Sequence, residues 1–289
     1  MDRYCVMGNP VAHSRSPWIH ARFAQLTGQT LDYGRREVAP GAFAQSVADF
    51  RREAREAGDR AGGCNVTVPC KFDAAALAGD RLSDRARLAG AVNTLRFDAD
   101  GGVFGDNTDG AGLVTDIQVH AGRSLAGARV LLIGAGGAAA GVLGPLLDAR
   151  PARLVLANRT LPKAEVLVTQ HNAVAARASC ALQACSLDAL GDGERFDIVV
   201  NGTAASLAGA GVPVPARVLA EGALAVDMMY GPAAAGFLAW ARAHGAVGRD
   251  GLGMLVGQAA ESFALWRGVR PDAAPVLAEL RALVDAGTA

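Results

Sequence analysis

Short apolar runs separated by amphipathic stretches recur through the middle of the chain. These runs predict buried parallel strands over residues 130–133, 153–157, 197–200, 224–227 and 246–247. Helical patterns lie between them, and strands that alternate with helices are typical of a parallel α/β sheet. We therefore predict a strand-and-helix alternation from about residue 111 to about residue 250.

The two ends of the chain follow a different pattern. Short strands are predicted over 3–7, 31–37, 65–68 and 94–97, with helices over 18–26 and 41–57. From residue 252 onward the pattern predicts two helices without an adjacent strand, and such a tail often packs back on a preceding domain. We expect two α/β domains, residues 1–110 with 251–289 and residues 111–250, with a ligand cleft between them.

The composition favours a well-packed soluble protein that binds a small molecule. The 289 residues are 51% hydrophobic and 19% charged, which argues against a disordered chain. Lys and Arg balance Asp and Glu at 28 each, so we expect no partnership with nucleic acid or with an anionic membrane. No apolar run approaches the ~20 residues of a membrane span, and no export signal opens the chain, so we expect a cytoplasmic protein.

The cysteines and histidines predict neither a disulfide framework nor a metal centre. Five cysteines are an odd number, and no two of them stand at CxxC spacing. The five histidines are scattered and form no cluster with cysteine. Reduced, buried thiols are the simplest interpretation.

A glycine-rich turn follows the apolar run at 130–133 and predicts a dinucleotide site. Gly134 permits a tight turn, Gly136 lets backbone amides approach a pyrophosphate, and Ala139 lets the next helix pack closely on the strand. The phosphates would then lie at a helix N-terminus, where unpaired N–H groups favour negative charge. The alternative is a tight turn in some other α/β domain.

The end of the second strand of that unit favours NADP over NAD. NAD sites usually place an acidic residue there, whereas this chain has Asn158, followed by Arg159, Thr160 and Lys163. A guanidinium binds a 2′-phosphate through charge-assisted hydrogen bonds that a carboxylate would oppose. The alternative is that these cations only solvate the start of a helix.

Polar segments of the first domain suggest a second binding site. Ser16 before Pro17 predicts a helix start with Ser16 as N-cap, and the hydroxyls of Ser14 and Ser16 suit a carboxylate. Lys71 follows a strand whose polar face carries Asn65 and Thr67, at the edge where α/β sheets bind ligands. Simple capping is the alternative for the serines, and an ordinary solvated charge is the alternative for the lysine.

The segment from 105 to 110 joins the two predicted domains. Its glycine-bounded, polar text predicts Asp106 as a turn residue. Asp109 precedes a predicted helix, so it is either an N-cap or a group that lines the cleft.

Six motifs together resemble the NADP-dependent shikimate dehydrogenase family over nearly the whole length and in the family's order. They are GNPVAHSRSP at 8–17, NVTVPCK at 65–71, AVNT at 91–94, GDNTDG at 105–110, NRT at 158–160 and GMLVGQ at 253–258. The resemblance implies reversible, NADPH-dependent reduction of 3-dehydroshikimate to shikimate, on the route to chorismate and the aromatic amino acids.

The resemblance also implies a role for each matching residue. Lys71 and Asp109 would be catalytic, with Lys71 as acid or base. The substrate would be held by Ser14, Ser16, Asn65, Thr67, Asn93, Thr108, Tyr230 and Gln258. The cofactor would be held by Gly134, Ala135, Gly136, Gly137, Ala138, Asn158, Arg159, Thr160, Lys163, Thr203, Met228 and Gly251.

Two segments depart from the family's text. The stretch at 201–207 lacks the serine that commonly follows Thr203, and Ala235-Gly236 replaces a Thr-Pro pair. The first change weakens the expectation that Thr203 touches the cofactor.

Lysine is protonated at neutral pH, so Lys71 is suited to donate a proton as a ketone becomes an alcohol. Asp109 would orient the ammonium and a substrate hydroxyl.

Three alternatives stay open at this point. One is an NAD-preferring quinate/shikimate dehydrogenase, against which Arg159 and Lys163 argue. Another is a non-catalytic regulator that senses NADPH or shikimate, which would need neither Lys71 nor Asp109. Glutamyl-tRNA reductases share the Asn-Arg-Thr text but lack the Ser14 and Ser16 segment. The chain would work as a monomer or a homodimer.

Overall fold

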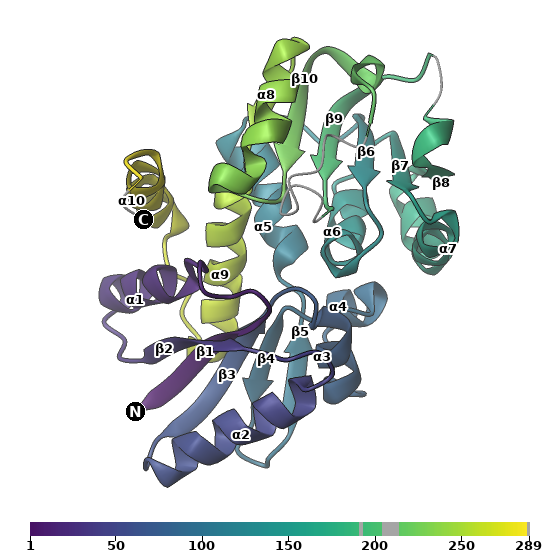
Figure 1. Ribbon diagram of the computed structural model, residues 1–289. Helices are drawn as coiled ribbons and strands as arrows, with labels where there is room; N and C mark the ends of the chain where they lie inside the picture. The colour runs from purple at the N-terminus through teal and green to yellow at the C-terminus, as the bar shows by residue number, and fades with distance from the viewer. Residues whose placement is uncertain (191–192, 204–213, 288–289) are drawn as a thin grey trace. The chain divides into compact units, whose positions relative to one another are not determined.

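A computed structural model describes residues 1–190, 193–203 and 214–287. The chain divides into two compact units. The first unit comprises Met1–Asp109 with Val256–Ala289, and the second unit comprises Gly110–Leu255. Figure 1 shows the elements of each unit, and the labels used below are those of that figure.

The first unit is built on a five-stranded sheet in the order β2-β1-β3-β4-β5. Parallel strands β1 (Asp2–Gly8), β2 (Asp32–Glu37) and β3 (Arg60–Val66) are joined by antiparallel strands β4 (Thr94–Phe97) and β5 (Val103–Asp106). Its helices are α1 (Ser16–Thr27), α2 (Phe43–Glu56), α3 (Lys71–Ala78), α4 (Asp84–Ala89), α10 (Ala273–Asp285) and most of α9 (Leu252–Arg267).

Alternating side chains of this sheet form two apolar layers. Met7, Val66 and Leu95 on one face pack in a buried cluster with Val47 and Phe50 of α2. Tyr4, Val6 and Tyr33 point to the other face, where Trp266 of α9 packs against them. The period of two along each strand therefore places helices on both faces.

Strand β3 is longer than predicted because it contains two glycines that look like strand breakers. A Cβ on Gly62 would lie 2.5 Å from the Tyr4 ring, and one on Gly63 would lie 2.2 Å from the Leu95 carbonyl oxygen. Close packing thus requires glycine at both positions. The prediction of a strand over 65–68 is wrong at its end, since β3 ends at Val66 and Val68 is 37% exposed.

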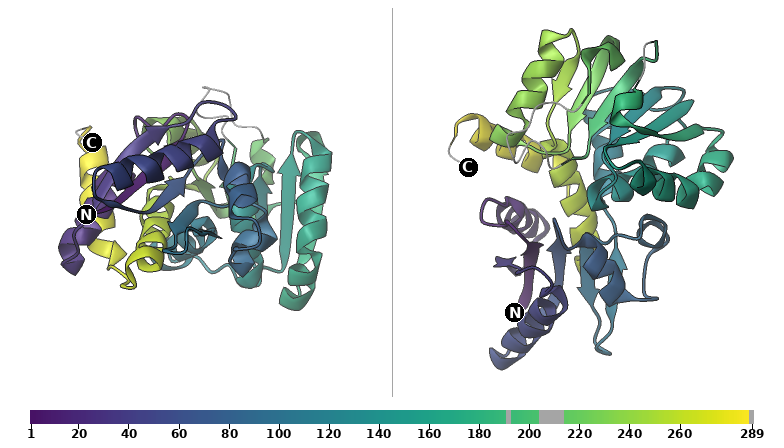
Figure 2. Two further views of the ribbon diagram at one scale, coloured as in Figure 1. Left: turned by 90° about the horizontal axis from the view of Figure 1, so that it is seen from below. Right: turned by 45° about the vertical axis from the view of Figure 1, so that its right-hand side comes forward.

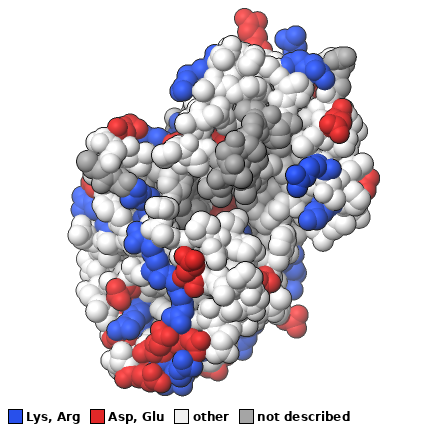
Figure 3. All heavy atoms as spheres, in the orientation of Figure 1, with Lys and Arg blue, Asp and Glu red and all other residues white. Residues whose placement is uncertain are grey.

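The outer surface around α2 carries charges of both signs. Arg36 forms an ion pair with Glu53, and Arg52 pairs with Asp49 and Glu56. On the face shown in Figure 3, basic and acidic side chains intermingle over the lower elements of the view. Such exposed pairs contribute little to stability, about 0–1 kcal/mol each.

The second unit is built on a six-stranded parallel sheet in the order β11-β10-β9-β6-β7-β8. The strands are β6 (Arg129–Ile133), β7 (Arg153–Asn158), β8 (Ala181–Ser186), β9 (Phe196–Asn201), β10 (Leu219–Asp227) and β11 (Val247–Arg249). This is the strand order of a doubly wound dinucleotide-binding fold.

Helices cover both faces of the second sheet. Helices α6 (Gly137–Asp148) and α7 (Leu161–Ala178) follow β6 and β7, and right-handed crossovers place them on one face. Phe237 and Ala241 of α8 (Ala235–Ala243) pack against Ile133, Val199 and Ala225 on the other face. Figure 2 shows α7 alongside β8 at one edge of this sheet. The chain enters the unit through α5 (Asp109–Thr115), which continues as a π-helix over Asp116–His120.

The predicted fold class is confirmed, a mixed α/β protein with a Rossmann-like sheet. Every predicted strand and helix overlaps an observed one, but β5 and β8 were not predicted. Among the described residues, no helix is long and apolar enough to cross a membrane.

Candidate active site

Lys71 and Asp109 are brought together in the first unit as a buried ion pair. The Lys71 ammonium donates a hydrogen bond to Asp109 Oδ2, and the residues are 8% and 5% exposed. Lys71 is the first residue of α3, and its carbonyl accepts a 2.9 Å bond from the Val92 amide. The interpretation of Lys71 as an ordinary solvated charge is therefore wrong.

Asp109 is the first residue of α5, so the N-cap alternative is wrong. Its carboxylate bonds to Lys71 and to Asn93, while its own amide donates to Asn107 Oδ1 at 3.2 Å. Both oxygens of Asp109 therefore bond side chains of the first unit.

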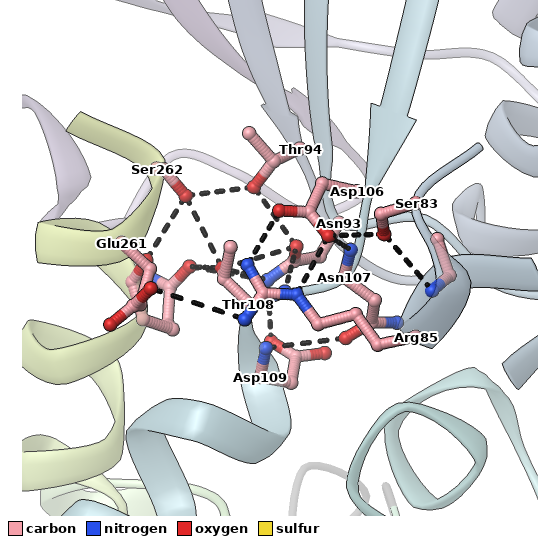
Figure 4. Close-up of polar contacts among 12 residues, drawn as sticks. Ser83, Arg85, Asn93, Thr94, Asp106, Asn107, Thr108, Asp109, Glu261 and Ser262 are labelled. Carbon is pink, nitrogen blue, oxygen red and sulfur yellow. Dashed lines mark hydrogen bonds and ion pairs between the residues drawn. The ribbon is translucent and has the colours of Figure 1, made fainter. Parts of the chain in front are cut away.

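Asn93, just before β4, orients the Asp109 carboxylate. Its Nδ2 donates to Asp109 Oδ1 at 2.8 Å and to Thr108 Oγ1 at 2.9 Å, while its Oδ1 accepts from the Thr108 amide at 2.8 Å. Gln258 Oε1 lies 3.3 Å from both Asn93 Nδ2 and Thr108 Oγ1. Figure 4 shows Asn93, Thr108 and Asp109 close together, with Ser262 of α9 beside them. The structure thus gathers Lys71 and four other predicted site residues into one network.

Asn65 lies deeper in the same network and is buried. Its Oδ1 accepts from Tyr33 Oη at 2.6 Å and lies 3.1 Å from His20 Nε2, and its Nδ2 donates to Ser262 Oγ at 3.0 Å. Ser262 Oγ in turn lies 2.7 Å from Thr94 Oγ1. The polar atoms of Asn65 are therefore engaged with other side chains.

Sequence reasoning missed His20, Tyr33, Thr94 and Ser262 as members of this network. Ser262 follows Gln258 by four residues on α9, so helical spacing was the signal that could have found it. Burial lowers the pKa of His20 to about 3, so this imidazole is neutral and its Nε2 serves as the donor to Asn65.

Ser14 and Ser16 lie next to each other at the start of α1. Their hydroxyl oxygens are 3.2 Å apart, and the Ser16 amide donates to Ser14 Oγ. Ser16 is the first helical residue and Arg15 is the N-cap, so the prediction of Ser16 as N-cap is wrong. Arg35 of β2 donates from Nε and Nη2 to the Ser14 carbonyl at 3.1 and 2.7 Å, which holds this segment in place.

Thr67, another predicted substrate-binding residue, is half-buried just after β3.

Asp106 is a buried strand residue and not the predicted turn residue. It ends β5, and its carboxylate accepts from Ser83 Oγ at 2.5 Å and from Arg85 Nε and Nη2 at 2.7 and 2.5 Å. Burial alone would raise the pKa of Asp106, but the bonds and charge of Arg85, with Ser83, lower it below its ordinary value. The side chain is therefore ionised.

The glycine turn of the second unit leaves room for a phosphate. Gly134 has φ +106°, and a Cβ there would lie 3.1 Å from Thr203 Cγ2, so glycine is required. A Cβ on Gly136 would meet nothing within 4 Å, and no side chain caps α6, which begins at Gly137 and Ala138. Ala135 lies within this turn, so the predicted phosphate-binding residues surround an uncapped helix start.

The predicted 2′-phosphate group lies at the end of β7. Asn158 Nδ2 donates to the Thr160 carbonyl at 2.8 Å, which turns the chain into α7. Arg159, Thr160 and Lys163 are exposed, and within the described ranges neither cation forms an ion pair. Two unpaired cations beside the strand end fit an NADP 2′-phosphate.

Met228 and Gly251 pack against each other in the second unit. A Cβ on Gly251 would lie 2.3 Å from the Met228 carbonyl oxygen, so a larger residue would displace Met228. Thr203 donates from its amide and hydroxyl to Asn201 Oδ1 at 3.2 and 2.8 Å, and Tyr230 precedes a 3-10 turn over Gly231–Ala234. The changed text at 204–207 lies outside the described residues.

No group of three or more His, Cys, Asp or Glu side chains is arranged to hold a metal ion in the part of the chain that the structure describes. All five cysteines are free.

Comparison with known protein families gives three matches that together span most of the chain. Residues 6–95 match the shikimate dehydrogenase substrate binding domain, residues 117–209 match shikimate / quinate 5-dehydrogenase, and residues 251–281 match the shikimate 5'-dehydrogenase C-terminal domain.

Individual relatives agree with the family matches. Shikimate dehydrogenase (NADP(+)) of Methylibium petroleiphilum is 64% identical over 98% of this chain and 95% of its own. The crystal structure of an Ael1 enzyme from Pseudomonas putida is 46% identical, covering 97% and 98% of the two chains with a TM-score of 0.84. Shikimate 5-dehydrogenase from Thermus thermophilus, solved with NADP(H) and shikimate, is 32% identical, covering 97% and 99% with a TM-score of 0.80.

Proposed function

This chain belongs to the shikimate dehydrogenase family, and from that membership we propose that its first unit binds the substrate and its second unit binds the cofactor. It is an NADP-dependent oxidoreductase that interconverts 3-dehydroshikimate and shikimate. The observation that carries the catalytic assignment is the buried Lys71–Asp109 pair, because a desolvated, oriented ammonium is equipped for proton transfer.

Lys71 acts as the general acid during reduction. As the carbonyl carbon gains a hydride, its oxygen gains negative charge, and the Lys71 ammonium donates a proton to it. Asp109 holds the ammonium in place, and Asn93 holds Asp109 through the 2.8 Å bond to Oδ1. In the direction of oxidation, the neutral amine takes the proton back from the alcohol.

The remaining predicted residues of the first unit, with Tyr230 of the second unit, bind the substrate. Ser14 and Ser16 accept the carboxylate, because two adjacent hydroxyls at an uncapped helix start favour an anion. Tyr230 assists them. Thr67, Asn93, Thr108, Asp109 and Gln258 bond the ring hydroxyls. Asn65 belongs to the same substrate-binding set, and its side chain also bonds Tyr33 and Ser262.

The second unit fits NADP through its open glycine turn and unpaired cations. NADPH, when bound, supplies the hydride. The segment from Gly134 to Ala138 holds the pyrophosphate, and Asn158, Arg159, Thr160 and Lys163 hold the ribose 2′-phosphate. Met228, packed on Gly251, supports the nicotinamide, and Thr203 borders the glycine turn. The expected cleft for these ligands stays a prediction.

The remaining features of the proposal concern assembly and compartment. One chain carries every proposed group, so a monomer suffices, and a homodimer is the alternative. We place the protein in the cytoplasm, where its five free cysteines stay reduced. The NAD-preferring and sensing alternatives are not favoured, given relatives above 60% identity that use NADP.

Steady-state kinetics test the proposal directly. Purified protein is given shikimate or quinate with NADP or NAD, and absorbance at the nicotinamide band is followed. We expect kcat/KM for shikimate to be at least about tenfold higher with NADP than with NAD. Equal or higher kcat/KM with NAD would contradict the roles of Arg159 and Lys163.

A further inference from the structure

Asp106 is a second buried carboxylate three residues before Asp109, and the mechanism above does not use it. The residue is 5% exposed, and its oxygens accept bonds from Ser83, from Arg85 and from the Asn107 amide at 2.7 Å. A buried carboxylate is costly unless it is paired, so Arg85 is the residue that permits it there.

Two asparagines connect Asp106 to the reactive pair. The backbone amide of Asn107 donates to Asp106 Oδ1, and the side-chain Oδ1 of Asn107 accepts from the backbone amide of Asp109. Asn93 donates its amide to the Asp106 carbonyl at 3.1 Å and its Nδ2 to Asp109 Oδ1 at 2.8 Å. The backbone amide of the neighbouring Val92 donates to the Lys71 carbonyl. Lys71 and Asp106 are therefore each hydrogen-bonded through their carbonyls to one of two consecutive residues, Val92 and Asn93.

Arg85 reaches Asp106 from α4, as Figure 4 shows. Its Nη1 also lies 3.9 Å from Glu261 of α9, a carboxylate that pairs with Arg270. The charges around Arg85 are therefore arranged so that its guanidinium balances Asp106, while Glu261 has a second cation of its own.

We propose that Arg85 is a positioning residue for the proton transfer, because by balancing Asp106 it leaves Asp109 to govern the Lys71 ammonium. This inference rests on the proposed function of Lys71. Without Arg85, Asp106 would be a buried and unpaired carboxylate, a costly arrangement that would disturb the Asn107 and Asn93 bonds that hold Asp109. Asp109 would then orient the Lys71 ammonium less well.

A charge-rescue experiment tests this role. In Arg85→Gln we expect kcat with shikimate and NADP to fall about tenfold or more, with KM for NADP changed less than about twofold. In the double variant R85Q/D106N the carboxylate is neutral as well, so we expect kcat to recover at least about fivefold over R85Q. A purely structural role of the Arg85–Asp106 pair predicts that the kcat of R85Q and R85Q/D106N follows their thermal stability, whereas the positioning role predicts a loss of kcat in R85Q protein that is fully folded at the assay temperature.

The matched control is Arg87→Gln on the same helix. Arg87 Nη2 donates to the backbone carbonyls of Asp80 and Leu82, so its loss should leave kcat unchanged. Arg85→Lys keeps the charge but loses the paired donors that bond both oxygens of Asp106, so we expect its kcat to fall, but by less than about tenfold.

Three outcomes would overturn the proposal. The first is an unaltered kcat in R85Q, and the second is a recovery of kcat of less than about fivefold in R85Q/D106N. The third is a tenfold loss of kcat in folded R85K, and this variant decides the question if R85Q does not fold. Turnover of shikimate by the unmodified protein in the same assay tests the proposed function separately. Failure of rescue in an active enzyme dismisses only the role of Arg85.

Discussion

At the scale of single residues, the reactive centre depends on an ammonium that solvent cannot easily reach. Lys71 and Asp109 are both buried, where water solvates charges poorly, so each charge is stabilised mainly by the other. Removing one partner leaves the other charge buried and unpaired. Substitutions here therefore act on the reaction and on stability at once.

Lys71→Ala should lower kcat by about 10²-fold or more, because general acid catalysis contributes that much. KM for shikimate should change less, since the proposed carboxylate site at Ser14 and Ser16 is left intact. Steady-state kinetics on protein shown to be folded by circular dichroism measure both. A fall in kcat of only a few-fold would dismiss Lys71 as the acid.

Arg159→Gln should raise KM for NADP about tenfold or more while leaving KM for NAD nearly unchanged, because the variant loses the proposed charge-assisted bond to the 2′-phosphate. Arg177→Gln, at the exposed end of α7, is the matched control with the same loss of charge. Equal effects of both substitutions on NADP would indicate a general charge effect.

Residue identities predicted which groups carry chemistry but not how each is bonded. Asp106 and Asp109 share one short polar segment, yet one ends a strand against Arg85 and the other pairs with Lys71. Arg85 and Ser262 lie 21 and 154 residues from their partners Asp106 and Thr108. Local patterns do not encode contacts over such separations.

At the scale of elements, β2 supports the loop before α1. Arg35 donates two bonds to the Ser14 carbonyl, and no carboxylate pairs with it among the described residues. Its charge is therefore available to an anion bound at Ser14 and Ser16.

Arg35→Gln should raise KM for shikimate about three- to tenfold with little change in kcat, because a nearby positive charge and a backbone anchor are lost. Arg36→Gln removes the adjacent cation, which pairs with Glu53, and should leave KM unaltered. Measuring both KM values at low and high salt completes the test. The proposal for Arg35 fails if the two variants behave alike.

Strand prediction succeeded at the central strand β6 and at β4, and it failed where packing decided. The expected strand at 94–97 is β4 as observed, and the central strand β6 extends the expected 130–133 by one residue. Strand β8 is a half-exposed edge strand without an apolar run, and β5 has four residues ending in Gly-Asp. These two strands form because they pair with β7 and β4, and no local pattern in the sequence predicts that pairing.

At the scale of the whole molecule, His20 couples stability to pH. Burial lowers its pKa to about 3, so the folded protein keeps it neutral while the unfolded chain protonates it below about 6.5. The stabilisation is present above about pH 6.5 and is lost as pH falls toward 3.

Between pH 6.5 and pH 5 the free energy of unfolding should therefore fall by about 2 kcal/mol on account of His20 alone. In His20→Gln this part of the pH dependence should disappear, whereas His120→Gln, an exposed control, should keep it. Urea unfolding at both pH values measures the difference. Identical pH dependence in H20Q and the unmodified protein would refute this account.

The interrupted sequence of the first unit has a consequence during translation. Gln258 and Ser262 complete a network whose other members, Asn93 and Thr108, leave the ribosome about 150 residues earlier. At typical synthesis rates that interval is roughly 10–30 s, during which the whole second unit emerges and has time to fold. A nascent chain stalled before Val256 would carry the complete second unit but lack Gln258 and Ser262 in the first, so we expect a chain that ends there to be inactive.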